Sequence, residues 1–282
     1  MHKLSYDIVF FGYGELTKRI INSLELKSIK VLCISNTQFS KLNEINSNSI
    51  DKLKYSDVPR LKVECKSAIY SWKHYENFSS NYKSIFNWLE SDDFLCERSY
   101  LLSSAAVYKD SLYPLNESPV NLSKDVSLNP KYILENLLSD IMAKKKVSHT
   151  NLRISNVYGK NLKYGLIAEV FESYIEGKKL NISRNFEIVR DYISIEDFLY
   201  ALQALFNVSD PPDVVNISTG IGTSTNQIFQ ALLQIGIQVS YNFQGSELKF
   251  LKHSSILDCS RLSSLVKWCP TPFMDNLIRI AR

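Results

Sequence analysis

The sequence has little of what marks most non-globular proteins. Its 282 residues contain only 9 glycines and 8 prolines, which excludes a collagen-like chain, and no low-complexity run indicates disorder. The 5 cysteines form no Cys-x-x-Cys pair, so we expect reduced thiols rather than a disulfide scaffold, and no zinc site. No apolar run approaches the ~20 residues of a membrane helix, and the apolar stretch near the N-terminus is too short for a secretion signal. These absences predict a soluble, cytoplasmic protein without a metal.

A strong charge of one sign is also absent. The chain has 33 lysines and arginines against 29 aspartates and glutamates, and this net charge of +4 is too mild to indicate a nucleic-acid partner. What the sequence does have is apolar material, because 45% of its residues are hydrophobic, which is enough for a sizeable core. A chain of this length forms one large domain or two modest ones.

The N-terminal segment has the pattern of a strand, a glycine turn and a helix. The apolar run 7–11 ends at Gly12-x-Gly14, apolar residues then recur at helical spacing, and a second apolar run covers 29–34. This order predicts the βαβ unit of a parallel sheet. Glycines at such a turn let the backbone approach a dinucleotide pyrophosphate, which then lies at the positive end of the helix. The third glycine of that pattern is replaced by Thr17.

The same unit supplies candidate residues for binding a cofactor. The acidic residue that binds the ribose 2′-hydroxyl of NAD is expected about 20 residues after the turn, where this sequence has Ser35-Asn36. Because neither side chain repels a 2′-phosphate, we predict NADP or NAD as the cofactor, with NADP bound at least as tightly. The cofactor-binding candidates are Gly12, Gly14, Glu15, Leu16, Ser35 and Asn36.

Apolar segments alternate between strand and helix spacing along the rest of the chain. Strands are expected near 68–70, 100–102 and 152–157, and a long amphipathic helix from 132. Residues 36–66 are polar and hard to assign, with a short helix expected at 39–45. The pattern is α/β throughout, and its C-terminal part is less regular.

Five short blocks then follow one another in a familiar order. Together they resemble the extended short-chain dehydrogenase/reductase family, in its NAD-dependent epimerase/dehydratase group, which acts on nucleotide sugars. Each block is weak alone, whereas the ordered set spans nearly the whole chain. The blocks are SSAAVY at 103–108 with Tyr132 after it, LRISNVYG at 152–159, RDYISIED at 190–197, NISTG at 216–220, and LD at 257–258 with VKW at 266–268.

The resemblance implies a fold and a set of site residues. The implied fold is α/β, a Rossmann-type doubly wound parallel sheet with a smaller C-terminal substrate-binding lobe. Ser104 would polarise the sugar carbonyl or hydroxyl, and Tyr132 would exchange the proton while also lying against the cofactor. The implied substrate-binding residues, which hold the nucleotide diphosphate, are Asn156, Arg190 and Lys249.

One position departs from the family pattern. The resemblance places a lysine four residues after the catalytic tyrosine, where it lowers the tyrosine pKa and binds the nicotinamide ribose, and this chain has Asn136 there. A tyrosine has an ordinary pKa of about 10, so without that charge it stays protonated near neutral pH. It can then serve as the acid in a reduction more readily than as the base in an oxidation.

The predicted function follows from these positions. Ala105 and Ala106 stand where the family's dehydratases have an acidic pair, which excludes a 4,6-dehydratase. We predict an NAD(P)-dependent 4-ketoreductase of a nucleotide-activated sugar, in the synthesis of surface polysaccharide precursors. Two alternatives stay open: a nucleotide-sugar epimerase, and a catalytically decayed protein that only binds a dinucleotide or a nucleotide sugar.

The resemblance also suggests a division of the chain. Residues 1–156, with about 187–208, would form the dinucleotide-binding Rossmann domain, and 157–186 with 209–282 a discontinuous substrate-binding lobe. Both ligands are expected in the cleft at the carboxyl ends of the strands. Family members pair through two helices of the Rossmann lobe, so a homodimer is possible, whereas no nucleic-acid or membrane partner is expected.

Overall fold

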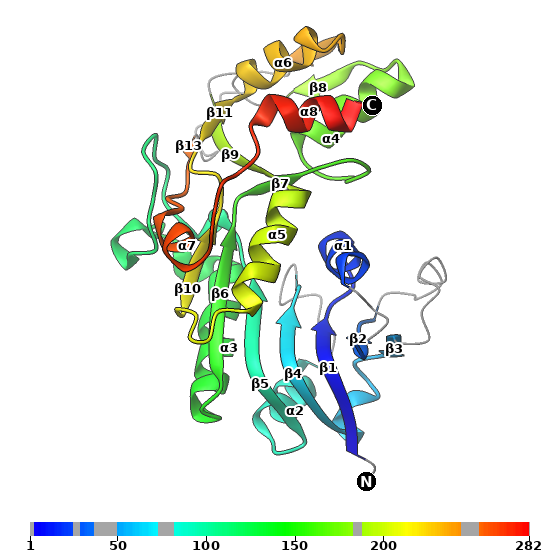
Figure 1. Cartoon of the computed structure of the whole chain (residues 1–282), viewed down its shortest axis with the longest axis vertical. Coiled ribbons are helices and arrows are strands. Elements are labelled where there is room, and N and C mark those ends of the chain that lie inside the picture. Colours follow the sequence, from blue (N-terminus) through cyan, green and yellow to red (C-terminus); the bar gives the residue numbers. More distant parts are fainter. Residues whose placement is uncertain are drawn as a thin grey trace. The chain divides into compact units, whose positions relative to one another are not determined.

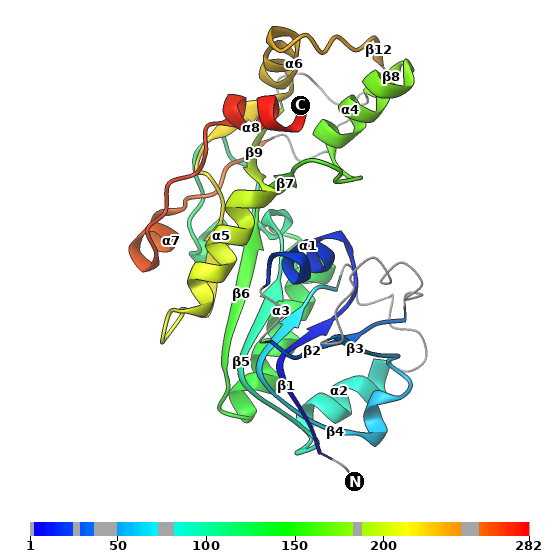
Figure 2. The ribbon, with the colours of Figure 1, turned by 45° about the vertical axis from the view of Figure 1, so that its right-hand side comes forward.

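The computed structural model describes residues 3–24, 29–36, 50–72, 82–182, 188–243 and 254–281 (Figures 1 and 2). The chain divides into two compact units of similar length, and each is discontinuous in sequence. The expected helix at 39–45 and the candidate Lys249 lie outside the described residues. Unit 1 comprises Met1–Ser104, Ser127–Leu152 and Ser209–Val215, and unit 2 comprises Ala105–Val126, Arg153–Val208 and Asn216–Arg282.

These boundaries differ in part from the division drawn on the sequence. Residues 105–126 and 153–208 belong to unit 2 in the structure, whereas the sequence placed 105–126 and about 187–208 with the dinucleotide-binding part. Which ligand each unit binds stays a prediction.

A parallel sheet organises unit 1. In the described part of the chain it has seven strands in the order β10-β6-β5-β4-β1-β2-β3. β1 pairs with β2 and with β4 in parallel, and β4–β5, β5–β6 and β2–β3 are parallel too. This arrangement confirms the expected α/β, Rossmann-type sheet, whose doubly wound order runs 3-2-1-4-5-6. The strands are β1 (Lys3–Phe11), β2 (Val31–Ile34), β3 (Ile50–Leu53), β4 (Lys62–Tyr70), β5 (Phe94–Leu102), β6 (Ser148–Ile154) and β10 (Val214–Ile217), of which β6 and β10 begin in unit 1 and end in unit 2.

The strand β3 is one of the elements that sequence reasoning missed. It has 4 residues and pairs with β2, with Val31 opposite Ile50. Residues 54–61 then connect β3 to β4 through a short 3-10 turn, Val58–Arg60, in place of a full crossover helix. Pro59 fixes the backbone angle at the start of this turn.

Two helices pack on one apolar cluster of the sheet. The helices of unit 1 are α1 (Glu15–Ser23), α2 (Tyr82–Glu90) and α3 (Pro130–Lys144). α2 and α3 bury their apolar residues in one cluster with β1, β4 and β5. Phe11 and Tyr70 stack there at 4.5 Å between ring centroids, and Trp88 lies 6.4 Å from Phe11. α1 contributes none of the described residues of this cluster.

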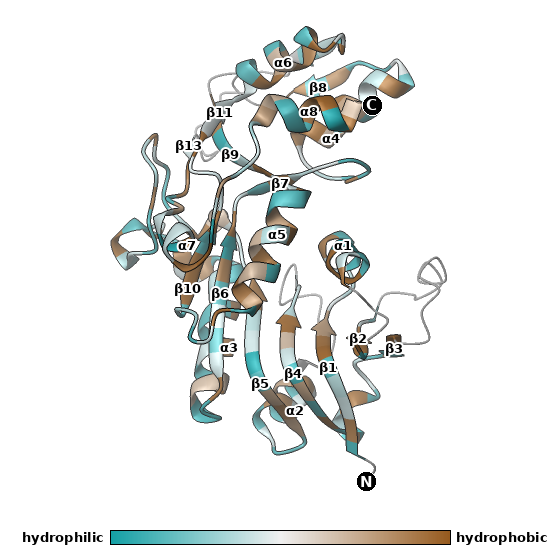
Figure 3. Ribbon diagram, viewed as in Figure 1, coloured by the Kyte–Doolittle hydropathy of each residue, from teal (hydrophilic) through white to brown (hydrophobic). Residues whose placement is uncertain are grey.

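The strands β1, β4 and β5 change character along their length. Their carboxyl halves are continuous apolar runs, such as Ala68–Tyr70 and residues 100–102, which are buried. Their amino halves alternate, and Lys66 and Glu97 are exposed there. The hydropathy colouring follows this change along β1 and β4 (Figure 3). The carboxyl edge of the sheet is therefore the better-packed one.

Unit 2 contains smaller sheets than unit 1 and, in its described part, five helices. β9 lies between β11 and β13, and β7 also pairs with it in parallel, while β8 pairs separately with β12. An apolar cluster joins α4, α6 and α8 to these strands. The strands are β7 (Asn156–Tyr158), β8 (Leu180–Ile182), β9 (Val189–Ser194), β11 (Gly222–Ser224), β12 (Tyr241–Phe243) and β13 (Ser254–Ser255). The helices are α4 (Leu166–Glu176), α5 (Ile195–Phe206), α6 (Thr225–Gln234), α7 (Ser260–Leu265) and α8 (Phe273–Ala281).

Two helices of unit 2 begin at serine caps. Ser194 caps α5 by accepting from Asp197 N. Ser224 and Gln227 form a full capping box at the start of α6. None of the described helices in either unit is long and apolar enough to cross a membrane.

A buried polar chain joins β5, β6 and α3 inside unit 1. Ser99 Oγ lies 2.8 Å from His149 Nδ1, and His149 Nε2 lies 3.0 Å from Asn151 Oδ1. Asn151 Nδ2 in turn donates to Ser139 Oγ at 3.1 Å. Burial lowers the pKa of His149 to about 4, so the imidazole is neutral at physiological pH.

This network makes unit 1 sensitive to acid. Because the pKa of His149 is lower in the folded chain than in the unfolded one, the unfolded chain binds more protons between about pH 6.5 and pH 4. We expect its contribution to stability to be present above pH 6.5 and to fall by about 2–3 kcal/mol on acidification to pH 4.5. Urea unfolding of the natural protein and of His149→Gln at both pH values measures this. An equal loss in both proteins would contradict it.

Candidate active site

The glycine turn after β1 has the geometry expected of a phosphate-binding turn. Gly12 has φ +101°, a conformation that side chains rarely adopt, and a Cβ there would lie 3.1 Å from Ser71 O. Gly14 is the N-cap of α1, and no atom of the described residues lies within 4 Å of where its Cβ would be. The backbone at Gly14 therefore faces open space, next to the amides of the first turn of α1.

The residues that follow the turn are one acidic residue, whose charge is partly neutralised, and two uncharged ones. Glu15, the first residue of α1, pairs with Lys18 at 3.7 Å and Arg19 at 3.4 Å. Leu16 is half-buried. Thr17, in the position of the missing third glycine, is fully buried, so the helix accommodates this side chain against the rest of unit 1.

The end of β2 carries no carboxylate. Ser35 is buried and its N–H donates to Leu53 O at 3.0 Å, while Asn36 is exposed. This bond aligns the end of β2 with the end of β3, so Lys54, the exposed residue directly after Leu53, comes beside Ser35-Asn36. The lysine was missed at the sequence level because β3 itself was not recognised.

The end of β5 presents two serines with different surroundings. Ser103 is buried, its N–H donates to Leu152 O at 2.8 Å, and its hydroxyl donates to Glu135 of α3. Glu135 is only 2% exposed. Ser104 is half-buried and is the last residue of unit 1 before the chain enters unit 2. The first serine thus ties β5 to α3.

The first turns of α3 are attached to the carboxyl ends of two strands. Lys131 Nζ donates to Leu102 O at 2.7 Å and also to Trp72 O. Tyr132 is half-buried and Asn136 is exposed. The two bonds from α3 to Leu102 and Ser103 bring the helix that carries Tyr132 to the strand end that precedes Ser104.

Lys131 and Glu135 are the residues of this region that sequence reasoning did not select. They are four residues apart, so they share one helix face, about 100° from the face of Tyr132 and Asn136. A signal for Lys131 does exist in the sequence. A lysine in the first turn of a helix is opposed by the helix dipole, which indicates that another group must hold its charge.

Unit 2 contains the predicted substrate-binding residues. Asn156 begins β7, is exposed, and donates from Nδ2 to Asp191 O at 2.9 Å. Arg190 is half-buried in β9, opposite Thr223 and Ser255. The amide of Asn156 is thereby fixed to the residue that follows Arg190, which places both candidates in one strand pair. Lys249 lies outside the described residues.

Asp191 organises the backbone behind these residues. Its carboxylate accepts from Thr219 N at 3.0 Å, Thr219 Oγ1 at 2.9 Å and Gly220 N at 2.9 Å. Burial raises the pKa of Asp191 to about 6, and the three donors act in the opposite direction. The carboxylate therefore holds the turn at 219–220 against β9, which is a structural role.

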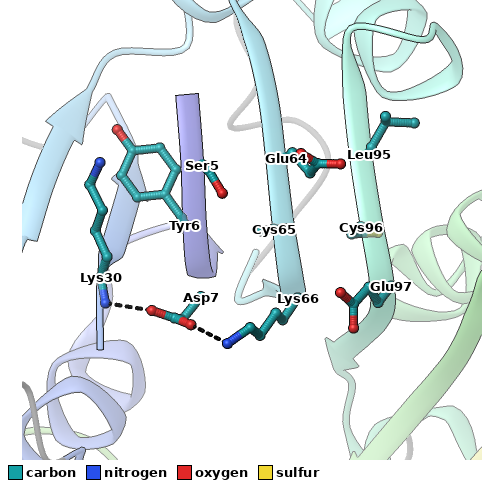
Figure 4. Close-up of a pocket in the computed structure, with 10 residues that line it drawn as sticks. All are labelled: Ser5, Tyr6, Asp7, Lys30, Glu64, Cys65, Lys66, Leu95, Cys96 and Glu97. Carbon is teal, nitrogen blue, oxygen red and sulfur yellow. Dashed lines mark hydrogen bonds and ion pairs between the residues drawn. The ribbon is translucent and has the colours of Figure 1, made fainter. Parts of the chain in front are cut away.

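A pocket of about 520 Å³ lies elsewhere in unit 1, at the amino halves of β1, β4 and β5 (Figure 4). Asp7 accepts there from Lys66 Nζ at 2.7 Å and from Lys30 N at 2.9 Å. The ion pair of Asp7 with Lys66 lies on exposed strand surface, where such a pair contributes little energy. Among the described residues, no group of three or more His, Cys, Asp or Glu side chains could hold a metal.

Comparison with known proteins finds a match to one family model. Residues 80–218 match the model of the NAD dependent epimerase/dehydratase family. The match covers 139 of the 282 residues, just under half of the chain. The matched segment contains β5, α3 and β9, and therefore Ser104, Tyr132 and Arg190. The resemblance drawn from the sequence motifs is confirmed.

Similar proteins are found among curated proteins and solved structures. GDP-6-deoxy-D-talose 4-dehydrogenase of Aggregatibacter actinomycetemcomitans is 28% identical over 159 residues, which cover 56% of this chain and 50% of that protein. The chain thus matches half the length of this relative. The UDP-glucuronic acid 4-epimerase of Bacillus cereus has a TM-score of 0.81 at 16% identity, covering 98% of this chain and 97% of that one. The UDP-glucose 4-epimerase of Thermotoga maritima has 0.77 at 19%, covering 96% of each. These structures show the fold.

The two serines at the end of β5 should differ in their effect on stability. Ser103→Ala removes a hydrogen bond to a buried carboxylate, and we expect it to lower the free energy of unfolding by about 1–3 kcal/mol. Ser104→Ala, at the adjacent half-buried position, is the matched control and should cost clearly less. Urea denaturation at pH 7.5 compares them. Equal losses would show that the bond from Ser103 to Glu135 does not hold α3 to β5.

Proposed function

We propose that the protein is an NAD(P)-dependent 4-ketoreductase of a nucleotide-activated sugar, in the synthesis of surface polysaccharide precursors. The observation that carries this proposal is the attachment of α3 to the carboxyl end of β5, through Lys131 to Leu102 O and through Ser103 to Glu135. It brings the helix of Tyr132 to the strand end of Ser104. A hydroxyl that polarises a carbonyl and a hydroxyl that donates a proton are what carbonyl reduction requires.

The turn between β1 and α1 fits a dinucleotide. The positive φ of Gly12 and the open space at Gly14 let a pyrophosphate approach the first amides of α1. Glu15 opposes an anion there, but its charge is shared with Lys18 and Arg19. When bound, the nicotinamide would supply the hydride. Gly12, Gly14 and the amides of Glu15 and Leu16 would hold the pyrophosphate, and Ser35 and Asn36 would face the adenosine ribose.

The proton chemistry favours reduction over the alternatives. Tyr132 would give its proton to the sugar oxygen while Ser104 donates a hydrogen bond to it. Asn136, one turn after Tyr132, is exposed and neutral, so this position supplies no charge that would help the tyrosine act as a base. Ala105 and Ala106, directly after Ser104, hold no acid that could expel a hydroxyl.

The substrate class rests on unit 2 and on the curated relative. Arg190 offers charge-assisted hydrogen bonds to phosphate oxygens, and Asn156 keeps its amide oxygen for the substrate while its nitrogen is bound to Asp191 O. The curated relative is named a 4-dehydrogenase of a GDP-linked 6-deoxy sugar. The reverse of oxidation at that carbon is reduction of a 4-keto sugar, which supports the same reaction type here. The cytoplasmic location and the homodimer stay predictions.

Two other functions make different predictions for the same assay. An epimerase would interconvert 4-hydroxy nucleotide sugars with bound NAD and would use both directions of hydride transfer in each turnover. A decayed protein would bind a dinucleotide or a nucleotide sugar without turnover, which the exposed Asn136 favours.

A paired assay tests the reductase assignment. We expect NADPH consumption with a 4-keto-6-deoxy nucleotide sugar and far slower epimerisation of the corresponding 4-hydroxy sugar. Tyr132→Phe should lower kcat by a factor on the order of 100 or more, because the proton donor is removed, and should change NADPH affinity far less. Tyr113→Phe is the control, since Tyr113 is 80% exposed. Robust epimerisation without ketosugar reduction would show an epimerase, and binding without any turnover would show a decayed protein.

Lys54 should contribute to the choice between the two cofactors. Its place after β3, beside Ser35-Asn36, puts a cation at the edge where the 2′-phosphate of NADP would lie. We expect Lys54→Ala to weaken NADPH binding about 10-fold and NADH binding much less, the scale of a lost charge-assisted hydrogen bond. Titration with adenosine 2′,5′-bisphosphate and 5′-AMP isolates the effect, with Lys83→Ala on α2 as the control. Equal weakening of both ligands would remove Lys54 from this role.

A further inference from the structure

Helix α3 is held to the sheet at both ends by lysine side chains. Near its start, Lys131 Nζ donates to Leu102 O, at the carboxyl end of β5, at 2.7 Å. Just past its end, Lys145 Nζ donates to Phe94 O, at the amino end of the same strand, at 2.7 Å, and also to Ser91 O. Each lysine thus contacts two backbone carbonyls, and the two attachments lie at opposite ends of β5.

The contact of Lys131 differs from that of Lys145 in what it joins. Its second carbonyl belongs to Trp72, two residues after β4 ends, so one ammonium group links the carboxyl ends of two neighbouring strands to α3. Its own backbone N–H donates to Asn129 Oδ1, the N-cap of the helix, at 3.0 Å. Lys131 is therefore fixed through both its backbone and its side chain, one residue before Tyr132.

The helix start would resist this arrangement without a strong partner. A positive charge in the first turn is opposed by the helix dipole, and a lysine loses considerable conformational freedom when it is held in one place. Two carbonyl oxygens repay these costs, and they point from the strand ends where ligands of open α/β sheets bind. The side chain thus sets the position of the first turn of α3 relative to the strand end that leads to Ser104.

We propose that Lys131 is a positioning residue of the reaction, which holds Tyr132 in register with Ser104 by bridging the carboxyl ends of β4 and β5. This inference rests on the proposed reductase function. Its physical basis is that a displacement of about 1 Å between reacting groups can cost roughly 100-fold in rate. Lys145 makes the same kind of bond at the opposite edge of the sheet, where it stabilises the helix without setting the position of Tyr132.

The pair of lysines provides a matched experiment. Lys131→Met and Lys145→Met each remove an ammonium group that donates to two backbone carbonyls, and Lys131→Arg restores donors at the first position. Four properties are measured in each protein: the melting temperature, the affinity for NADPH, kcat and KM for the ketosugar, and hydrogen exchange of the amides in the first two turns of α3. Lys131→Gln replaces Lys131→Met if the latter is not recovered folded.

The expected result separates position from stability. Lys131→Met should lower kcat by about 10- to 100-fold and speed exchange in the first turns of α3, with NADPH affinity and KM little changed. Lys145→Met should lower the melting temperature to a similar extent, speed exchange only at the other end of the helix, and keep kcat. Lys131→Arg should recover most of kcat.

Two results would overturn the inference while the reductase function stands. One is a loss of kcat that is the same in Lys131→Met and Lys145→Met, and the other is exchange in the first turns of α3 that Lys131→Met does not change. A natural protein that binds NADPH but reduces no ketosugar would overturn the proposed function, and the inference with it.

Discussion

The fold of unit 1 depends on how α3 is attached to β5. Apolar side chains of the helix pack in the cluster shared with α2, but such contacts allow sliding and rotation by themselves. Hydrogen bonds fix the placement, since Lys131 and Lys145 engage carbonyls at the two ends of the strand and Glu135 engages Ser103. The buried series of hydrogen bonds from Ser99 to Ser139 adds a further polar connection between α3 and the sheet. The helix is thus specified along its whole length by polar contacts of fixed direction.

This specification links the core of unit 1 to its proposed chemistry. The carboxyl ends of β4 and β5 are the continuation of apolar runs that are fully buried, so they are rigid points of attachment. The glycine turn follows β1, a strand of the same sheet. The close approach of Gly12 to Ser71 O restricts the backbone of this turn. Unit 2 builds its own candidate residues on β7 and β9, where Asp191 fixes the backbone beside Arg190 and Asn156.

Sequence reasoning succeeded where a local pattern decides the structure. The glycine turn, the buried strands near Ile69 and Leu101 and the helix of Tyr132 all have short-range signals, namely apolar periodicity and glycine. The family resemblance came from motifs of the same kind. β3 was missed because two of its four residues, Asp51 and Lys52, are charged, and only pairing with β2 makes the segment a strand.

The roles of side chains whose partners lie far away in the sequence could not be predicted in the same way. Lys131 is one residue from Tyr132 and faces another direction, so no local pattern marks it as part of the site. Its direction proves to be the informative feature, since it reaches carbonyls that lie 29 and 59 residues away in the chain. Likewise, nothing local distinguishes Ser103 from Ser104, and the difference between them arises from a glutamate on another element.

The short connection from β3 to β4 has a consequence for how stability is distributed. With only a 3-10 turn in residues 54–61, the amino halves of β1 and β4 carry exposed charges such as Lys66, and they bury less apolar surface than the carboxyl halves. The free energy that resists local opening therefore rises along each strand toward its carboxyl end. Thermal fluctuations will fray the sheet first at the edge opposite the glycine turn. The carboxyl ends of the strands, next to Ser104, stay paired during local openings that expose the amino ends to water.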